Sequence, residues 1–184
     1  MPVLNVHERI IAAPLDSVGR LIDSLSSPDD RLWPQELWPA MRFDRPLAVG
    51  ARGGHGPIRY DVEAYEPGRS VRFRFTGPKG FNGFHELAAE PSGAGSTCLR
   101  HTLQMRTTGL ARLSWPLVYR PLHDALIEDA LDKAERSLGR MPAGARWSPY
   151  VRLLRWALAA APPTARARSA PAETPTQLNE SAQR

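Results

Sequence analysis

The feature that most constrains the fold is a long helical pattern in residues 110–138, which follows several short segments of alternating polar and apolar residues. At 100° per residue, the apolar side chains of this pattern fall within one arc. A helix of this kind after a series of strands needs a concave sheet to cover its apolar face. We therefore expect an α+β fold in which a curved antiparallel sheet wraps around a long C-terminal helix and leaves a hollow for a ligand.

The helical pattern has a histidine near the centre of its apolar arc and a row of acidic residues on the opposite side. Pro121 cannot take an ordinary interior position, so the helix either restarts or kinks there, and residues 122–138 are its regular part. The arc contains Trp115, Tyr119, Leu122, His123, Leu126, Ile127, Ala130 and Ala134, and the acidic row contains Asp124, Glu128, Asp132 and Glu135.

The N-terminal part predicts one strand and two short helices. Residues 3–12 alternate as a strand does, and the strand ends at Ala13-Pro14. Apolar residues then recur at helical spacing from Leu15 to Leu25, which predicts an amphipathic helix. A second short helix is expected over residues 30–37, between neighbouring prolines.

The middle of the chain has the pattern of a β-meander. Strands are expected over residues 41–46, 58–65, 71–75, 84–90 and 97–107. The glycine-rich run GARGGHGP lacks the ending of a P-loop and is expected to be a flexible connection at the mouth of the hollow.

Matching the apolar faces of neighbouring strands predicts their register. A turn at Pro67-Gly68 pairs Ala64 with Val71, Val62 with Phe73 and Tyr60 with Phe75. A loop centred on Gly93 pairs Leu87 with Leu99 and places His85 directly opposite His101. Two imidazoles would then lie side by side on the concave face.

Charge argues against nucleic-acid binding by the folded domain. Residues 1–138 hold 17 basic and 17 acidic side chains, so the net charge of +5 belongs to the C-terminal part, with seven arginines and two glutamates. The single cysteine, Cys98, excludes an internal disulfide and the usual structural zinc spacings.

Targeting signals are not apparent. The N-terminus lacks the pattern of a secretory signal, and no apolar run approaches the roughly 18 residues that span a bilayer. A cytoplasmic location is expected. Arginine outnumbers lysine 22 to 2, which suggests a GC-rich, bacterial coding bias.

This order of elements resembles the START-like (SRPBCC) superfamily, and in particular its polyketide cyclase/dehydrase-like branch. The residues that carry the resemblance are Ile11-Ala12-Ala13-Pro14 with Val18, Gly50, the turn from Tyr65 to Arg69, and residues 122–138. The resemblance covers roughly residues 3–138. It implies a helix-grip fold around a hydrophobic cavity, with functions from lipid and hormone binding to polyketide cyclisation and dehydration. It carries no universal catalytic motif.

The candidate site is the concave face of the sheet together with the apolar arc of the helix. An apolar cavity with a few convergent polar groups is how small-molecule sites orient a ligand. The expected lining residues are Tyr60, Val62, Phe73, Phe75, His85, Leu87, His101, Leu103, Tyr119, His123, Leu126 and Ile127.

The three histidines of this set have more than one interpretation. Each could simply satisfy a hydrogen bond in the core, or hydrogen-bond a ligand carbonyl or phenol, or move a proton in an enzyme. A metal site is less favoured, because no local His-x-x-x-His spacing or obvious carboxylate supports it. We expect no metal and no cofactor. The hydroxyls of Tyr60 and Tyr119 contact a ligand only if they face inward.

The C-terminal part divides into three segments after the domain of residues 1–138. Residues 139–147 are a linker, residues 148–161 an amphipathic helix, and residues 162–184 a disordered tail. In the helix, Tyr150, Val151, Leu154, Ala157 and Leu158 share one side, Arg152 and Arg155 lie on the other, and Trp156 lies near the boundary. Docking on the domain is favoured over a protein partner or an anionic membrane.

Three functions remain open on these grounds. The first is binding of a hydrophobic small molecule or lipid in an internal cavity. The second is a cyclase or dehydratase with His85, His101 and His123 as acid/base groups. The third is an interaction module recruited through its basic C-terminal helix.

Overall fold

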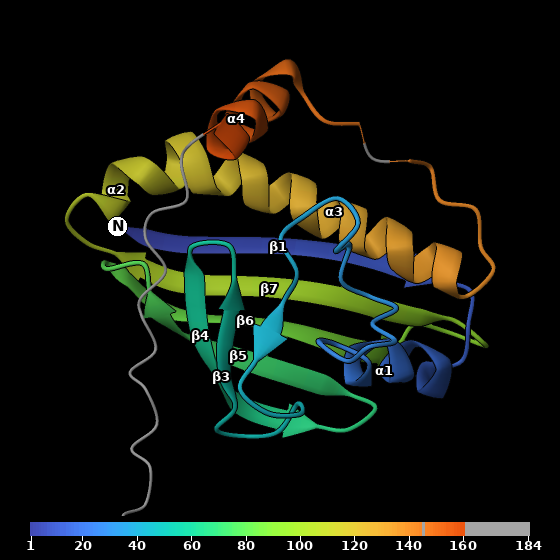
Figure 1. Cartoon of the computed structure of the whole chain (residues 1–184). Coiled ribbons are helices and arrows are strands. Elements are labelled where there is room, and N and C mark those ends of the chain that lie inside the picture. The colour runs from blue at the N-terminus through green and yellow to red at the C-terminus, as the bar shows by residue number, and fades with distance from the viewer. Residues whose placement is uncertain (145, 161–184) are drawn as a thin grey trace, which may run out of the picture.

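The computed structural model describes residues 1–144 and 146–160 as one antiparallel sheet with helices on its concave side (Figure 1). The strand order is β1-β7-β6-β5-β4-β3-β2. The elements are β1 (Pro2–Ile11), α1 (Leu15–Asp23), β2 (Arg42–Phe43), β3 (Arg52–His55), β4 (Ile58–Glu66), β5 (Ser70–Gly77), β6 (Phe81–Pro91), β7 (Thr97–Thr107), α2 (Ala111–Ser114), the π-helical turn η1 (Trp115–Tyr119), α3 (Arg120–Ser137) and α4 (Pro149–Ala160).

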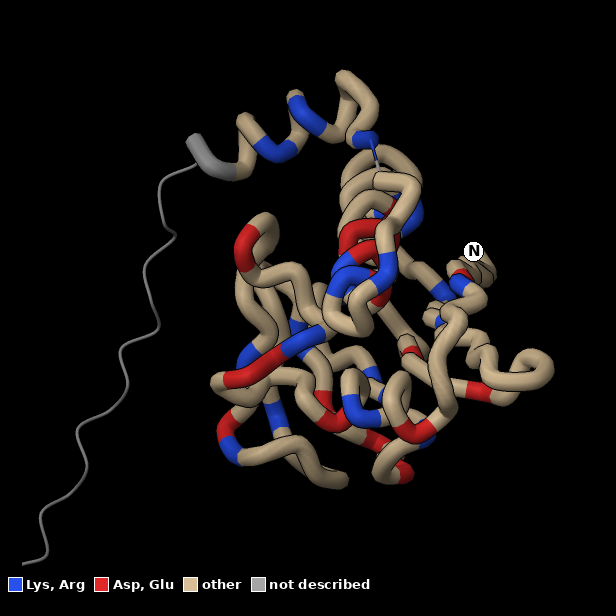
Figure 2. The backbone as a smooth tube through the Cα atoms, turned by 90° about the vertical axis from the view of Figure 1, so that its right-hand side faces the viewer, with Lys and Arg blue, Asp and Glu red and all other residues tan. Residues whose placement is uncertain are grey.

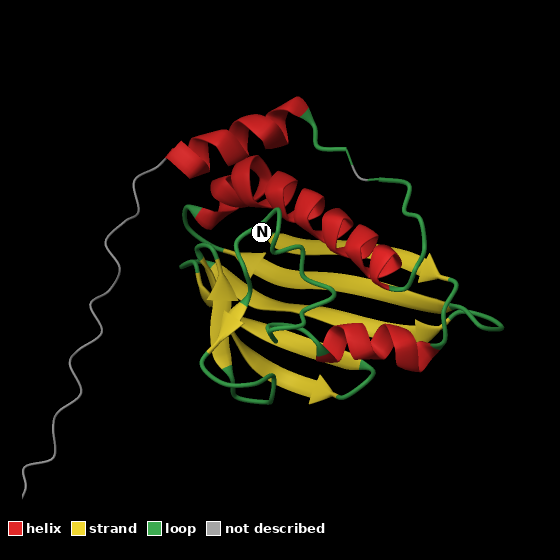
Figure 3. Cartoon of the chain, turned by 45° about the vertical axis from the view of Figure 1, so that its right-hand side comes forward, coloured by secondary structure: helices red, strands yellow, loops and turns green. Residues whose placement is uncertain are grey.

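The sheet curves around α3, and α1 covers its other end (Figure 3). This confirms the predicted helix-grip arrangement. The core lies between the concave face of the sheet and these two helices, because both helices turn their apolar sides toward it. Its largest fully buried side chains include Leu21 and Ile22 of α1, Phe73 and Leu99 of the sheet, and Leu131 of α3.

The second short helix expected after β1 is absent, and residues 30–37 form a series of turns instead. The carboxylate of Asp30 accepts hydrogen bonds from the backbone N–H groups of Ser26, Leu32 and Trp33, at 2.8, 3.0 and 2.7 Å. An aspartate that bonds nearby backbone donors stabilises a turn in competition with a helix. The prediction of a helix there was wrong for this reason.

The register of β4 and β5 matches the prediction except at one end. Val62 pairs with Phe73 and Tyr60 with Phe75, as expected. Ala64 pairs with Arg72 and not with Val71, because the register shifts between Val62 and Ala64. This irregularity turns Ala64 outward, where it is exposed.

The predicted register of β6 and β7 was wrong by two residues. Leu87 pairs with His101 and His85 with Leu103, whereas Leu99 pairs with Ala89. The loop is centred one residue later than expected, since Pro91 pairs with Thr97. A shift by an even number keeps every side chain on its face, so His85 and His101 still point inward as diagonal neighbours.

The helix passes Pro121 without a break, because a π-helical turn precedes it. In this turn the N–H of Arg120 donates to the carbonyl of Trp115, five residues earlier. Pro121 has no N–H for the carbonyl of Leu117, and the hydroxyl of Tyr150 in α4 donates to that carbonyl instead, at 2.6 Å. The proline thus leaves a backbone acceptor that α4 uses for docking.

The acidic row of α3 faces polar side chains of β1. Arg9 of β1 donates to Glu128 at 3.0 Å, to Asp132 at 3.1 Å and to Glu135. Asp132 is buried in this contact. β1 therefore turns polar side chains toward the helix and exposes apolar ones, among them Leu4 and Ile10, on its outer face.

The linker and α4 fold back onto α3. The indole N–H groups of Trp38 and Trp147 both donate to the buried carboxylate of Asp129, at 2.7 and 2.8 Å. The guanidinium of Arg155 lies 4.2 and 4.0 Å from the centres of these two rings. The prediction that Arg155 lies on the outer side of α4 was wrong, because its cation packs between the indoles. The predicted disordered tail, 162–184, lies outside the described residues.

Among the residues that the structure describes, none of the helices combines the length and apolar character needed to cross a bilayer.

Candidate functional site

Three histidines converge between the sheet and α3. His85 comes from β6, His101 from β7 and His123 from α3. The ring centres of His85 and His101 are 5.5 Å apart, and those of His101 and His123 are 5.0 Å apart. Nε2 of His101 and Nδ1 of His85 approach to 3.3 Å, which makes one hydrogen bond whose direction depends on the tautomers. The fold thus brings the predicted trio together.

Aromatic side chains hold the ring of His85 in place. Phe73 and Phe75 stack on it with ring centres at 4.8 and 5.1 Å, and Tyr60 meets it edge-on at 4.8 Å. Alternation along β4 and β5 places all three rings on the concave face. The imidazole is therefore fixed in an apolar enclosure.

Four buried polar atoms around these rings have no hydrogen-bond partner among the described residues. They are Oη of Tyr60, Nε2 of His85, Nδ1 of His101 and Nε2 of His123. Leaving one such atom unsatisfied costs about 1–3 kcal/mol. Native cores contain few such atoms, so a cluster of four calls for a bound group or water.

The space beside these atoms is small. A void of about 30 Å³ lies between the sheet and α3. This volume accommodates roughly one or two water molecules. Within the described residues, aromatic and imidazole rings fill most of the space between the sheet and α3 where the sequence predicted a large internal cavity. The void is lined by Trp33, His55, Phe75, His85, His101, Leu103, His123, Leu126 and Ile127.

A larger groove lies next to the void. Its volume is about 340 Å³, and its walls are α3, α4 and the turn between β3 and β4. His55, His123 and Leu126 line both spaces, so the groove leads toward the histidines. Most of its walls are apolar, and they include Trp38, Pro39, Ile58, Val118, Tyr119, Leu122 and Leu158.

The predicted site residues divide into two sets. Phe75, Leu103 and Ile127 line the void together with the three histidines and Leu126, and Tyr119 lines the groove. Tyr60 and Phe73 support His85 from behind, whereas Val62 and Leu87 are buried in the core and line neither space.

His55, His7 and Asp124 belong to the site but were missed. His55 ends β3 and lies in the glycine-rich run, which was expected to be only a connection. The run is a tight hairpin, since a side chain at Gly54 (φ +151°) would lie 2.0 Å from the carbonyl oxygen of Ile58. A histidine in a run of glycines was the available signal.

Burial keeps the inner histidines neutral. Desolvation lowers the pKa of His55 to about 3 and lowers those of His85 and His101 well below the ordinary value. The pKa of His123 is also lowered by burial, against the opposing effect of its hydrogen bond to Asp124. Neutral imidazoles offer one donor and one acceptor each at neutral pH.

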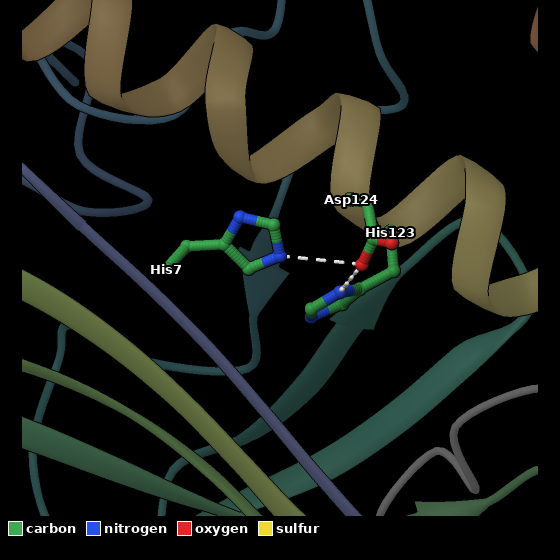
Figure 4. A group of neighbouring side chains, drawn as sticks. All are labelled: His7, His123 and Asp124. Atoms are coloured by element: carbon green, nitrogen blue, oxygen red, sulfur yellow. Dashed lines mark hydrogen bonds and ion pairs between the residues drawn. The ribbon is translucent and has the colours of Figure 1, made fainter.

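His7 and His123 approach the same carboxylate oxygen from two sides (Figure 4). Oδ1 of Asp124 lies 3.2 Å from Nε2 of His7 and 3.4 Å from Nδ1 of His123. Nδ1 of His7 also lies 2.7 Å from Glu128. The hydrogen bond to Asp124 is the largest cause that raises the pKa of His7, so the imidazolium form fits between two carboxylates.

The same three residues form a set that could hold a metal ion. Their ligand atoms lie within 4.8 Å of one another, and imidazole nitrogens with a carboxylate suit zinc or iron. In the described part of the chain this is the one such group, so the trio considered from the sequence does not form one. The hydrogen bonds among His7, Asp124 and His123 already account for their approach.

Comparisons with known proteins identify the fold. No protein-family model matches the chain, and no curated protein matches its sequence. Among solved structures, norcoclaurine synthase from Thalictrum flavum in complex with dopamine and hydroxybenzaldehyde is 13% identical, with a TM-score of 0.54, over 79% of this chain and 90% of that one.

Two further solved structures show the same likeness. CalU16 from Micromonospora echinospora is 17% identical over 86% of this chain and 92% of its own, with a TM-score of 0.54. A protein from Thermobifida fusca is 18% identical over 77% and 99%, with a TM-score of 0.57. The chain therefore shares the helix-grip fold of these solved structures, which is the fold that the resemblance in the sequence implied.

Proposed function

We propose that this protein binds a hydrophobic small molecule or lipid in the groove between α3, α4 and the β3–β4 turn. The apolar part of the ligand lies in the groove. A hydroxyl or carbonyl group of the ligand reaches the void and bonds the histidines. On the sequence features described above, we assign the protein to the bacterial cytoplasm as part of this proposal.

The observation that carries the proposal is the cluster of unsatisfied polar atoms beside the void. Nε2 of His85, Nδ1 of His101 and Nε2 of His123 are buried without a partner in the described structure, and their rings line the void. One ligand hydroxyl can donate to one imidazole and accept from another. Each bond removes a cost of about 1–3 kcal/mol, which favours a ligand with one polar end.

Ligand binding can be tested with two probes that differ by one hydroxyl, naphthalene and 1-naphthol. We expect 1-naphthol to bind at least about fivefold more tightly, because its hydroxyl pairs with a buried nitrogen. His101→Leu should reduce this preference. Leu103→Met is the matched control, since Leu103 lines the same void without a polar atom. Equal affinity of the wild type for both probes, measured by calorimetry, would contradict the proposal.

A second candidate function is acid/base catalysis at His123. Asp124 accepts from Nδ1 of His123 and leaves Nε2 free in the shared wall of groove and void. A carboxylate that holds one imidazole nitrogen orients the other nitrogen for proton transfer. The lowered pKa keeps this imidazole neutral, so it can accept a proton at neutral pH.

This second candidate predicts proton abstraction next to a carbonyl, which is the step that an aldol cyclisation requires. In D₂O, Nε2 of His123 would take a methyl proton from 2-acetonaphthone, and the enolate would take up a deuteron. NMR should show deuterium incorporation that His123→Gln abolishes. His55→Gln should retain it, because His55 lines the same spaces without a carboxylate partner among the described residues. Deuterium incorporation that persists in His123→Gln would exclude His123 as the base.

A further inference from the structure

Exposed apolar side chains gather on the surface formed by α2, η1 and α4. Seven of the fourteen large apolar side chains that are exposed in the described residues lie there, so the surface is more apolar than the rest of the molecule. We call it the α2–α4 surface, and its members are Leu110, Leu113, Leu117, Tyr150, Leu153, Trp156 and Leu158.

α4 lies beside the helical segment that α2 and η1 form. α4 crosses the chain near the N-terminal end of the long helix in both views (Figures 1 and 3). The hydroxyl of Tyr150 bonds the carbonyl of Leu117 and ties the segments together. Val151 is buried and Arg155 packs on the indoles, which leaves Leu153 and Trp156 on the outer face of α4.

The patch carries positive charge and no negative charge. Residues 109–120 and 148–160 contain four arginines and no aspartate or glutamate. α4, the uppermost helix in Figure 2, has blue basic positions among its tan residues and no red acidic ones. Arg112 and Arg152 are exposed, and the ion pairs found within the described residues include neither of them. Among the acidic side chains of α3, Asp124 pairs with Arg120 as well as with His7, and Asp132 pairs with Arg9 of β1, which leaves Arg112 and Arg152 as the unpaired cations of the surface in the described residues.

We propose that the α2–α4 surface binds the face of an anionic lipid bilayer. Apolar side chains such as Leu153 and Trp156 would enter the boundary between headgroups and acyl chains, and Arg112 and Arg152 would lie among the headgroup phosphates. A long arginine side chain can reach the phosphates while its stem covers apolar surface. This inference does not depend on the ligand that the groove binds.

Charge complementarity favours a bilayer over a second copy of the chain. If two copies met through this surface, arginines of one copy would face arginines of the other, and the surface offers no acidic side chain to pair with them. The headgroups of an anionic bilayer supply the negative charges that this surface lacks. The attraction is worth enough to change binding about fivefold for each arginine near the membrane.

The test is co-sedimentation of the full chain with phosphatidylcholine vesicles that contain or lack phosphatidylglycerol. We expect binding only to the anionic vesicles, with a loss at high salt. The double variant Leu153→Ser, Trp156→Ser should reduce the partition coefficient at least about tenfold. Arg112→Gln and Arg152→Gln should each reduce it about fivefold at low salt.

A matched control lies on the outer face of β1. Leu4 and Ile10 are 69% and 64% exposed, against 57% for Leu153 and 69% for Trp156. The variant Leu4→Ser, Ile10→Ser should retain vesicle binding, because β1 lies outside the α2–α4 surface. Equal loss in both double variants would overturn the proposal. So would a dimer, seen by light scattering, that the Leu153 and Trp156 substitutions dissociate, since the surface would then be an interface between copies.

Discussion

At the residue scale, the site shows how the surroundings of a histidine decide whether its pKa is raised or lowered. His7 lies between the carboxylates of Asp124 and Glu128, which raise its pKa. His85 and His101 lie among aromatic rings, and burial lowers their pKa. His123 lies at the border, with one nitrogen near Asp124 and the other in the interior. The two ends of the cluster, one with a raised and one with lowered pKa values, therefore differ in environment and not in residue type.

These opposite shifts predict how stability depends on pH. His55, His85, His101 and His123 have folded pKa values below the unfolded value of about 6.5, so below that pH the unfolded chain binds protons that the folded chain does not. Each contributes a loss of up to about 1.4 kcal/mol per pH unit of acidification. We expect the free energy of unfolding to fall steeply from about pH 6.5 to about pH 5, as measured by urea denaturation.

His7 acts in the opposite direction and provides the control. Its raised pKa contributes stability that is fully present below pH 6.5, the unfolded value, and is lost as the pH rises through its folded pKa. His7→Gln should therefore remove the decline on the alkaline side and keep the acid-side loss. A free energy of unfolding that stays constant between about pH 7 and about pH 5 would show that the inner histidines are not buried as neutral groups.

At the element scale, periodicity predicted the face of most strand residues and the pairing of Val62 with Phe73, but not the outward turn of Ala64 or the register of β6 with β7. Alternation along β6 and β7 placed His85 and His101 on the concave face, and the two-residue error in register kept them there. A register shift of two residues leaves every side chain on the same face, so a pattern of period two cannot detect it. Only the length of the loop before Thr97 sets that register, and its glycines allowed more than one centre.

Contacts between distant elements were beyond the reach of these patterns. A helical wheel shows that Asp124, Glu128 and Asp132 share one side of α3. It does not show that His7 and Arg9 of β1 lie opposite them. An arginine on the polar side of a helix is expected to be exposed to water. Arg155 instead packs on the indoles of Trp38 and Trp147, which come from two separate segments. The volume of the internal cavity could not be predicted for the same reason, because it depends on how rings from several strands fill one space.

At the scale of the whole molecule, the groove exists because the segment after α3 folds back and packs α4 against α3. The sheet and α3 close on themselves and leave a void of about 30 Å³. The larger groove has α4 as one wall, through Arg155 and Leu158. The buried carboxylate of Asp129, which accepts from Trp38 and Trp147, fixes the linker that brings α4 into place. The C-terminal helix is therefore part of the proposed binding site as well as the proposed membrane surface.

This arrangement predicts that the variant Arg155→Ala loses affinity for a ligand but keeps its preference between ligands. The substitution removes the cation that packs on two indoles and the hydrogen bond to the carbonyl of Leu37, so α4 should detach and the groove should lose a wall. Both naphthalene and 1-naphthol should bind about tenfold more weakly in calorimetry, because less apolar surface is buried. The preference for 1-naphthol should persist, since the buried nitrogens of His85, His101 and His123 are untouched. Loss of that preference would place the probe's hydroxyl at α4 and not at the histidines.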